Sequence, residues 1–300
     1  MLASLHTGAS LGVWPSVADE AERLGADLFC FPGGRIGLRE GHEASRNAIY
    51  DLAARVPLDG LLVWTSSLSG VEQGGAVGAF LDRFRGRPLV SLSSGAPGVP
   101  VVTIDYYGGM REAMRHAIKG HGFRRVAFIR GPALHPGAEE RYQAYLDSLE
   151  AAGIGLDPRL VSPPCPWDSG REALLELIDG RGLVPGRDFL ALVASSDLMA
   201  LWAARTLLAR GYRIPEDIAV IGMNNSLESR LSTPPLTTVE GPFAELGAKG
   251  FRTLMALVSG EQVEERSTLP ATLVVRQSCG CPSSSFVLAA TSGGPPPEAS

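Results

Sequence analysis

Short apolar runs alternate with segments of helical spacing along most of this chain of 300 residues. The clearest runs occupy residues 60–64, 126–129, 190–194 and 218–222. Because they carry almost no polar positions, they indicate strands that are buried on both faces of a sheet. Between them, apolar residues recur every three or four positions, which predicts helices that cover the sheet. The pattern therefore predicts an α/β protein with parallel sheets.

Weaker signals complete the expected order of elements. Further strands are expected at residues 1–5, 28–31, 88–92, 101–104 and 272–276, with an extended segment at 160–162. Helices are expected at residues 16–24, 43–55, 75–84, 108–119, 138–152, 169–178 and 242–258, and directly after Asp197. Residues 282–300 are rich in Ser, Gly and Pro, so we expect a disordered tail there.

Composition and charge narrow the class of protein. The chain is 45% hydrophobic and 20% charged, with a net charge of −5. An acidic chain has no overall field that attracts nucleic acid or an anionic membrane. No apolar run approaches the roughly 20 residues that a membrane span needs, and the N-terminus lacks a basic signal-peptide start. We therefore expect a cytoplasmic protein with no membrane contact.

The cysteines raise the question of a metal site. Cys279 and Cys281 are separated by one residue, but a closed zinc site needs about four ligands. No second Cys or His pair stands near them in the sequence, and His116 and His121 are interpreted as residues of a helix end. We therefore expect reduced, structural thiols, with no metal and no cofactor.

Residues 190–238 hold the most informative pattern. One buried strand there ends in the polar segment 195–197, and the next ends in Asn224 and Asn225. In α/β sheets, ligands bind outside the carboxyl ends of the strands. The segment therefore predicts one wall of a small-molecule site.

The same segment resembles the effector-binding domain of the lactose-repressor (LacI/GalR) family of bacterial regulators. The matching positions are Asp197, Met199, Ala200, Ile214, Pro215, Asp217, Gly222, Pro235, Leu236, Thr237 and Thr238. The resemblance extends over nearly the whole chain. It implies a two-lobed periplasmic-binding-protein-like type I fold, in which each lobe is a parallel sheet flanked by helices.

The family resemblance also implies how the chain divides. Residues 1–119 and 237–265 would form the N-terminal lobe, and residues 120–236 and 266–281 would form the C-terminal lobe. A ligand would close the cleft between the lobes as a hinge closes.

Three residues are the leading candidates for ligand binding. Arg141 matches an Arg that clamps hydroxyls or carboxylates in the family, because a planar guanidinium donates paired hydrogen bonds. Trp167 stands where an aromatic residue packs on the ligand ring in sugar-binding relatives. Asn224 replaces a ligand-binding Asp of the family, which keeps hydrogen bonding but drops the charge. The alternatives are a solvated helix Arg for the first and a core or surface aromatic for the second.

Further candidates carry open alternatives. Ser196 and Asp197 stand where the family usually has Asn-Asp. Ser196 has a shorter reach than Asn, and capping the next helix is the alternative role for Asp197. Phe243 is expected in the cleft wall or, equally, in the helix core. The remaining candidates are Tyr107, His6 and Thr7.

Three functions are compatible with the sequence. The first is a ligand-sensing domain that binds a sugar or related polar effector and forms a homodimer. The second is a DNA-binding repressor truncated at its start, since no helix-turn-helix is evident and no nucleic acid contact is expected through this chain alone. The third is an enzyme on a doubly wound fold, which the absence of a phosphate loop and of a catalytic set disfavours. The sequence does not identify the ligand.

Overall fold

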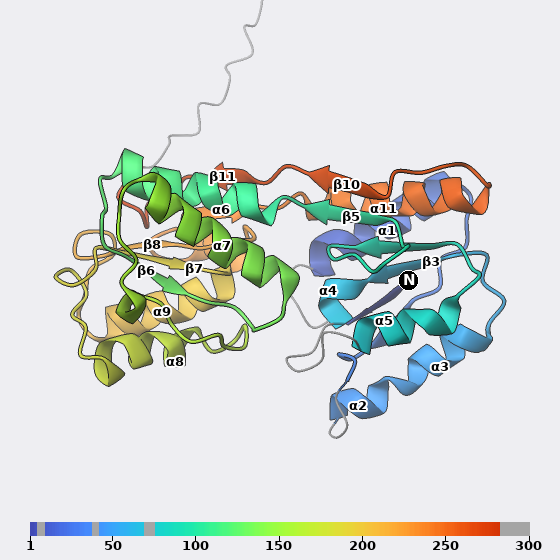
Figure 1. Ribbon diagram of the computed structural model, residues 1–300, viewed down its shortest axis with the longest axis horizontal. Coiled ribbons are helices and arrows are strands. Elements are labelled where there is room, and N and C mark those ends of the chain that lie inside the picture. The colour runs from blue at the N-terminus through green and yellow to red at the C-terminus, as the bar shows by residue number, and fades with distance from the viewer. Residues whose placement is uncertain (5–9, 38–41, 69–75, 283–300) are drawn as a thin grey trace, which may run out of the picture.

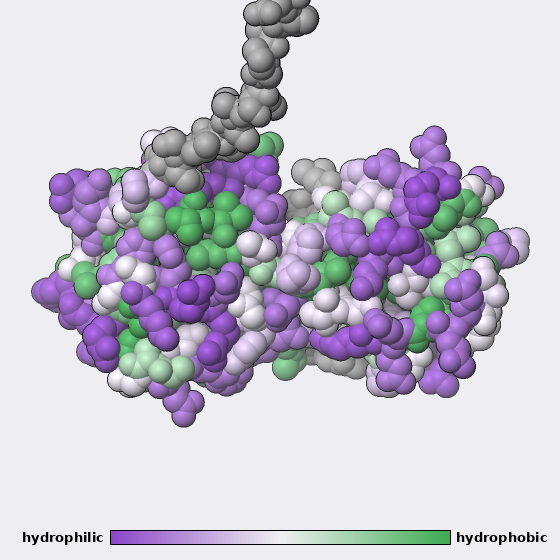
Figure 2. Space-filling view, turned by 90° about the horizontal axis from the view of Figure 1, so that it is seen from above, coloured by the Kyte–Doolittle hydropathy of each residue, from purple (hydrophilic) through white to green (hydrophobic). Residues whose placement is uncertain are grey.

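Two α/β lobes lie side by side in the computed structural model, which describes residues 1–4, 10–37, 42–68 and 76–282 (Figure 1). Figure 2 shows the same lobes from above, with a narrower waist between them. Their arrangement confirms the expected two-lobed fold with parallel sheets.

The N-terminal lobe is built on one six-stranded parallel sheet with the strand order β10-β5-β4-β3-β1-β2. Its strands are β1 (Leu2–Ser4), β2 (Phe31–Gly33), β3 (Leu61–Trp64), β4 (Leu89–Leu92), β5 (Val101–Ile104) and β10 (Arg266–Leu269). Its helices are α1 (Ser10–Arg23), α2 (His42–Arg46), α3 (Ala48–Arg55), α4 (Thr65–Leu68), α5 (Ala76–Leu81) and α11 (Phe243–Val258), with a 3-10 turn at Asp82–Phe84.

Alternate residues of the central strand β3 face opposite sides of this sheet. Leu62 and Trp64 join the core beneath α1 and α11, whereas Leu61 and Val63 join the core beneath α3 and α5. All four side chains are buried, as expected for a parallel strand that is covered on both faces.

The C-terminal lobe has a three-stranded parallel sheet with the order β6-β7-β8. The strands of this sheet are β6 (Val126–Ile129), β7 (Ala191–Ala194) and β8 (Ala219–Ile221). The lobe also contains β9 (Thr238–Glu240) and β11 (Thr272–Val274). Its helices are α6 (Tyr106–Arg115), α7 (Pro136–Ala151), α8 (Gly170–Leu175), α9 (Asp197–Ala209) and α10 (Leu227–Leu231). Short turns follow at His116–Gly120, Pro158–Leu160 and Glu176–Gly180, the first and last of them π-helical.

Strands β9 and β11 pair with each other as an antiparallel ribbon. A single parallel bridge between Ile221 and Thr237 links the ribbon to the three-stranded sheet. Helix α6 contacts both strands of the ribbon as well as α7. The ribbon is therefore part of the C-terminal lobe, at the point where the chain passes between lobes.

The chain crosses between the lobes at positions that differ from those expected. Helix α6 packs on α7, so the first crossing follows β5 rather than residue 119. Strand β10 pairs with β5 in the N-terminal sheet, although residues 266–281 were expected in the other lobe. β10 was not expected from the sequence, because three of its four residues are polar and it lies at a sheet edge.

Within the described residues, no helix combines the length and the apolar character that crossing a bilayer requires.

Candidate functional site

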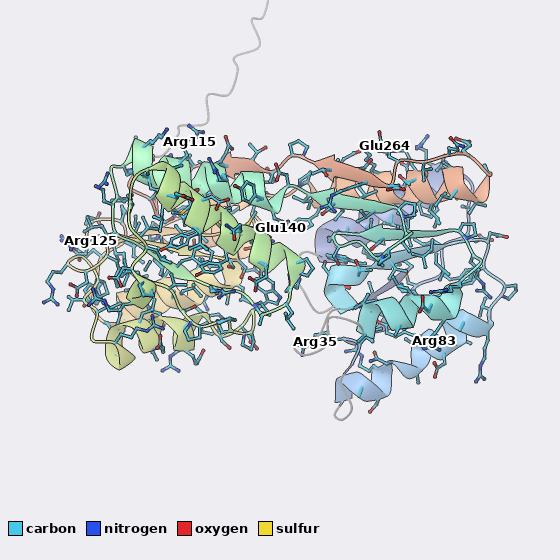
Figure 3. All side chains as sticks on the ribbon, in the orientation of Figure 1. Arg35, Arg83, Arg115, Arg125, Glu140 and Glu264 are labelled. Carbon is cyan, nitrogen blue, oxygen red and sulfur yellow. The ribbon has the colours of Figure 1, made fainter. Side chains whose placement is uncertain are left out.

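Arg141 lies at the centre of a polar cluster near the carboxyl ends of the strands of the C-terminal lobe. It belongs to α7, and Figure 3 labels its neighbour Glu140 on the half of that helix nearer to the other lobe. The Arg141 side chain is only 4% exposed. Its guanidinium donates to the Ser195 carbonyl at 2.7 Å and, over a longer 3.4 Å, to the side-chain oxygen of Asn224. One side chain thus joins α7 to the segments that follow β7 and β8.

Two aromatic rings flank this guanidinium. Its central carbon lies 4.4 Å from the ring centroid of Tyr106 and 5.5 Å from that of Trp167. Such cation–π contacts are favourable and hold the flat group in a fixed plane. Trp167 is positioned by Gly131, where a Cβ would lie 2.8 Å from the indole, and by the edge of the His135 ring, whose centroid is 5.1 Å away.

Tyr106, and not the expected Tyr107, faces the cluster. The Tyr107 hydroxyl donates to the carboxylate of Asp147 on α7 at 2.6 Å, so it lies in the interface between α6 and α7. Adjacent residues of a helix point about 100° apart, which is why only one of the two reaches Arg141. Gly137 makes room for the Tyr106 ring, since a Cβ there would lie 3.1 Å from it.

Asn224 offers an open donor to the cluster. It follows β8 with a φ of 113°, and its backbone N–H donates to the Val239 carbonyl at 2.7 Å. Its side-chain oxygen accepts from Arg141, whereas its NH₂ group has no protein partner among the described residues. Of the sequence candidates, the structure therefore brings together Arg141, Trp167 and Asn224.

Ser196 and Asp197 have structural partners instead. The Ser196 hydroxyl accepts from the Met199 N–H at 3.3 Å and caps α9. Asp197 is 1% exposed and accepts from the Ser226 N–H at 2.7 Å and from the Thr238 hydroxyl at 2.5 Å. Burial raises the pKa of Asp197 in spite of these hydrogen bonds. The geometry favours the capping and bracing roles over ligand contact.

The other candidates lie elsewhere. Phe243 opens α11 and packs against α1, where a Cβ on Gly12 would lie 2.9 Å from its own Cβ. It is partly buried against the N-terminal core, which favours the core alternative. His6 and Thr7 lie outside the described residues and stay predictions.

The charge of Arg141 is not neutralised by a close carboxylate. Among the described residues, none lies within 4.0 Å of its guanidinium, and its buried Nε has no hydrogen-bond partner. Burial lowers the pKa of Arg141, although Tyr106, Glu140 and Asp197 act in the opposite direction. Burying a cation and an N–H group without partners is costly, so the site is suited to a ligand that supplies acceptor oxygens.

His135 bridges the cluster to the other lobe. Burial and the nearby Arg141 lower its pKa to about 4, while hydrogen bonds with its own backbone and with that of Ser66 in α4 oppose the shift. Its neutral Nδ1 accepts from the Ala138 N–H at 3.3 Å and caps α7.

Stability should therefore depend on pH through His135. The unfolded state takes up a proton near pH 6.5 and the folded state only near pH 4, so the free energy of unfolding falls as pH falls through this window. His135→Asn keeps a capping side chain but removes the titration. Between pH 7 and pH 5, wild type should lose about 2 kcal/mol more than this variant in denaturant unfolding. Parallel losses in the two proteins would contradict the assignment.

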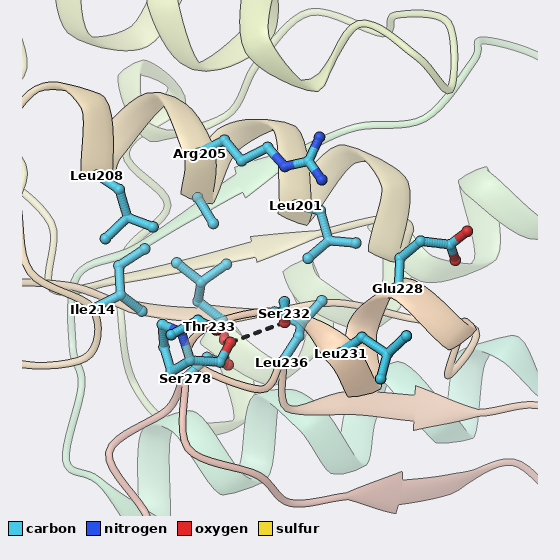
Figure 4. A pocket seen from close by; sticks show the side chains of 13 residues that line it. Leu201, Arg205, Leu208, Ile214, Glu228, Leu231, Ser232, Thr233, Leu236 and Ser278 are labelled. Atoms are coloured by element: carbon cyan, nitrogen blue, oxygen red, sulfur yellow. Dashed lines mark hydrogen bonds between the residues drawn. The ribbon is translucent and has the colours of Figure 1, made fainter.

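A separate pocket of about 350 Å³ opens between α9, α10 and the segment before β9 (Figure 4). Much of its lining is apolar and includes Leu201, Leu208, Ile214, Leu231 and Leu236. None of the residues around Arg141 contributes to it. The pocket is therefore distinct from the polar cluster.

A histidine pair that is far from the cysteines in the sequence lies beside them in the structure. His116 and His121 do form a pair beside Cys279 and Cys281, because the fold brings the end of α6 against the C-terminal segment. The sequence signal was the spacing of the two histidines, which falls within that of zinc sites.

Comparisons with known proteins identify the family and agree with the fold. The family model for the periplasmic binding protein-like domain matches residues 116–279, more than half of the chain. The HTH-type transcriptional regulator CelR of Thermobifida fusca is 40% identical over 199 residues, which are 65% of this chain and 55% of CelR. The chain thus spans about half the length of this curated relative.

Solved structures show the same fold over nearly the whole chain. A LacI family transcriptional regulator from Mycobacterium smegmatis is 26% identical with a TM-score of 0.78, covering 92% of this chain and 96% of that one. The complex of CelR with cellobiose is 32% identical with a TM-score of 0.76, covering 92% and 83%. The chain belongs to the family of periplasmic binding protein-like domains, in the form that serves as the effector domain of LacI/GalR regulators.

Proposed function

We propose that this chain senses a sugar or similarly polar small molecule, held between its two lobes, and passes the signal to transcription. The observation that carries the proposal is Arg141: a buried cation beside two aromatic rings, whose Nε–H has no acceptor among the described residues. A ligand hydroxyl or ring oxygen would satisfy it.

The chemistry around Arg141 suits a carbohydrate. The flat face of Trp167 can pack on the apolar C–H face of a sugar ring, while Arg141 and Asn224 donate to its hydroxyls. The CelR structure noted above contains cellobiose, which supports a disaccharide as the first ligand to try. The uncharged side chain of Asn224 gives no partner for a strongly cationic ligand.

Binding would act by shifting an equilibrium between open and closed lobes. Trp167 and Arg141 belong to the C-terminal lobe. Their neighbour His135 is hydrogen-bonded to the backbone of Ser66, so α4 of the N-terminal lobe lies close to the same cluster. A ligand that contacts both lobes binds the closed form better and so increases its population.

The similarity to regulators supports three further parts of the proposal. The ligand is released unchanged rather than turned over, the protein acts in the cytoplasm where its target DNA lies, and the working unit is a homodimer. Exposed apolar side chains on α9 and α10 supply a surface for such a dimer: Leu198, Trp202, Leu208, Leu227 and Leu231.

The test is a thermal-shift screen, followed by calorimetry, with cellobiose, other disaccharides, monosaccharides, polyols and nucleosides. A ligand present at 100 times its Kd should add about 2.7 kcal/mol to the free energy of unfolding. Unchanged ligand recovered after long incubation would support sensing. Turnover of any of these compounds would overturn the non-enzymatic function, and a panel without a single saccharide shift would overturn the sugar assignment.

A further inference from the structure

Four metal-binding side chains converge at the outer end of α6, away from the ligand cluster. They are His116, His121, Cys279 and Cys281, named here the His–Cys cluster. Figure 3 labels Arg115, the neighbour of His116, at the end of α6 that points away from the other lobe, whereas Glu140 lies nearer the gap. The cluster has no role in the sensing site described above.

A π-helical turn pairs the two histidines. The turn spans His116–Gly120, and the His121 N–H closes it on the His116 carbonyl at 3.2 Å. The two imidazoles therefore meet edge to face with centroids 4.7 Å apart, and their Nε2 atoms are 3.1 Å apart. The stacking of His121 on Phe123, with rings 8° from parallel, fixes the second imidazole.

A tight turn aims both cysteines at the same point. Gly280 lies between them with a φ of 97°, a conformation that favours glycine, and its N–H donates to the Gln277 carbonyl at 2.9 Å. Ser278 anchors the segment, because its hydroxyl accepts from the Thr237 N–H and donates to the Val220 carbonyl. These hydrogen bonds fix the segment that carries both sulfurs.

The distances match a tetrahedral metal centre. Zinc bonds of about 2.05 Å to nitrogen and 2.3 Å to sulfur put ligand atoms roughly 3.3 Å (N to N) and 3.6 Å (N to S) apart. The Nε2 of His116 lies 3.4 Å from the Cys279 sulfur and 3.7 Å from the Cys281 sulfur, and that of His121 lies 3.4 Å from the latter. All four ligand atoms lie within 4.8 Å of one another.

The donor set and its surroundings also fit zinc. Two thiolates neutralise a divalent ion, and Cys₂His₂ is a common structural zinc set with all four positions filled. The Thr237 hydroxyl donates to the Cys279 sulfur at 3.1 Å, as an outer hydrogen bond that supports a thiolate. Cys279 is 1% exposed, whereas the two histidines and Cys281 are only partly buried, so an ion has access.

We propose that the His–Cys cluster binds one zinc ion, which fastens the C-terminal segment to the end of α6. The ion replaces two thiol protons, which are released to solvent on binding. The ion joins α6, which follows the first crossing between the lobes, to the segment with Cys279 and Cys281, which follows the last crossing. The site is structural, because four protein ligands leave no position open for substrate.

The test measures zinc in the full chain, purified with a reductant and without chelator, loaded with Zn²⁺ and freed of excess by gel filtration. Wild type should retain about one zinc per chain, and Cys279→Ser/Cys281→Ser should retain below about 0.1. The matched control is Cys30→Ser/Cys165→Ser, which removes the two free cysteines outside the cluster and should retain about one. Equal zinc in the cluster variant and wild type, or none in wild type, would overturn the site.

A second measurement needs no variant. Replacing zinc by Co²⁺ in wild type should give the visible bands of tetrahedral cobalt and a near-ultraviolet thiolate-to-cobalt band. Octahedral, thiolate-free spectra would contradict the geometry. A Cys279–Cys281 disulfide in protein kept reduced, detected by mass spectrometry, would also overturn the proposal.

Discussion

Arg141→Met is expected to weaken binding of the effector by about 100-fold. The substitution keeps most of the side-chain volume between Tyr106 and Trp167 but removes the charged donors. Two hydrogen bonds from a charged group to a ligand contribute about 3 kcal/mol together, and 1.4 kcal/mol corresponds to a tenfold change in Kd. Calorimetry with the ligand found in the screen gives the ratio.

The matched control for this substitution is Arg205→Met. Arg205 also stacks on an aromatic ring, 5.3 Å from the centroid of Trp202, but on the face of α9 that borders the separate pocket. Its loss should leave Kd within about twofold. Binding by a folded Arg141→Met variant that stays within a few-fold of wild type would show that the effector does not contact the cluster around Arg141.

Asp197→Ala should destabilise the protein by about 3 kcal/mol. Asp197 is fully enclosed, and its carboxylate satisfies a backbone N–H of Ser226 and the hydroxyl of Thr238. Its removal leaves the buried Thr238 hydroxyl and the partly buried Ser226 N–H without their acceptor, at a cost of about 1–3 kcal/mol for a buried donor, and leaves a small void. Denaturant unfolding of the ligand-free protein measures the loss.

Ser196→Ala is the natural comparison for Asp197→Ala. It removes only a long capping hydrogen bond at the neighbouring position and should cost about 1 kcal/mol. If the two variants lose equal stability, Asp197 does not brace the segment after β8, and a role in ligand contact gains support.

The sequence predicted the candidate site where a motif fixed both a residue and the element that presents it. Arg141 lies in the helix that follows β6 and Asn224 follows β8, so the fold brought the two together, and Trp167 reaches Arg141 from the loop before α8. Tyr107 points into the interface between α6 and α7, because adjacent residues of a helix point about 100° apart and Tyr106 is the one that faces Arg141. Ser196 and Asp197 show a different difficulty, since the same residue types serve as caps and as ligand contacts.

Contacts between residues that are far apart in the chain could not be predicted from the sequence, for physical reasons. The His–Cys cluster joins residues more than 150 positions apart, and the pairing of His116 with His121 needs a π turn that periodicity does not signal. Strand β10 gives no clear signal in the sequence, because a short edge strand with exposed Arg266 and Thr268 has no continuous apolar run.

The ribbon formed by β9 and β11 bears on how the molecule can move. Thr238 to Glu240 and Thr272 to Val274 are hydrogen-bonded to each other, and α6 lies against both strands. The three connections between the lobes therefore lie together and act as a single hinge. Sliding one connection past another would break main-chain hydrogen bonds. Effector-driven motion should reduce to one bending coordinate, visible as hydrogen-exchange protection that changes at the rims of the lobes while the ribbon amides stay protected throughout.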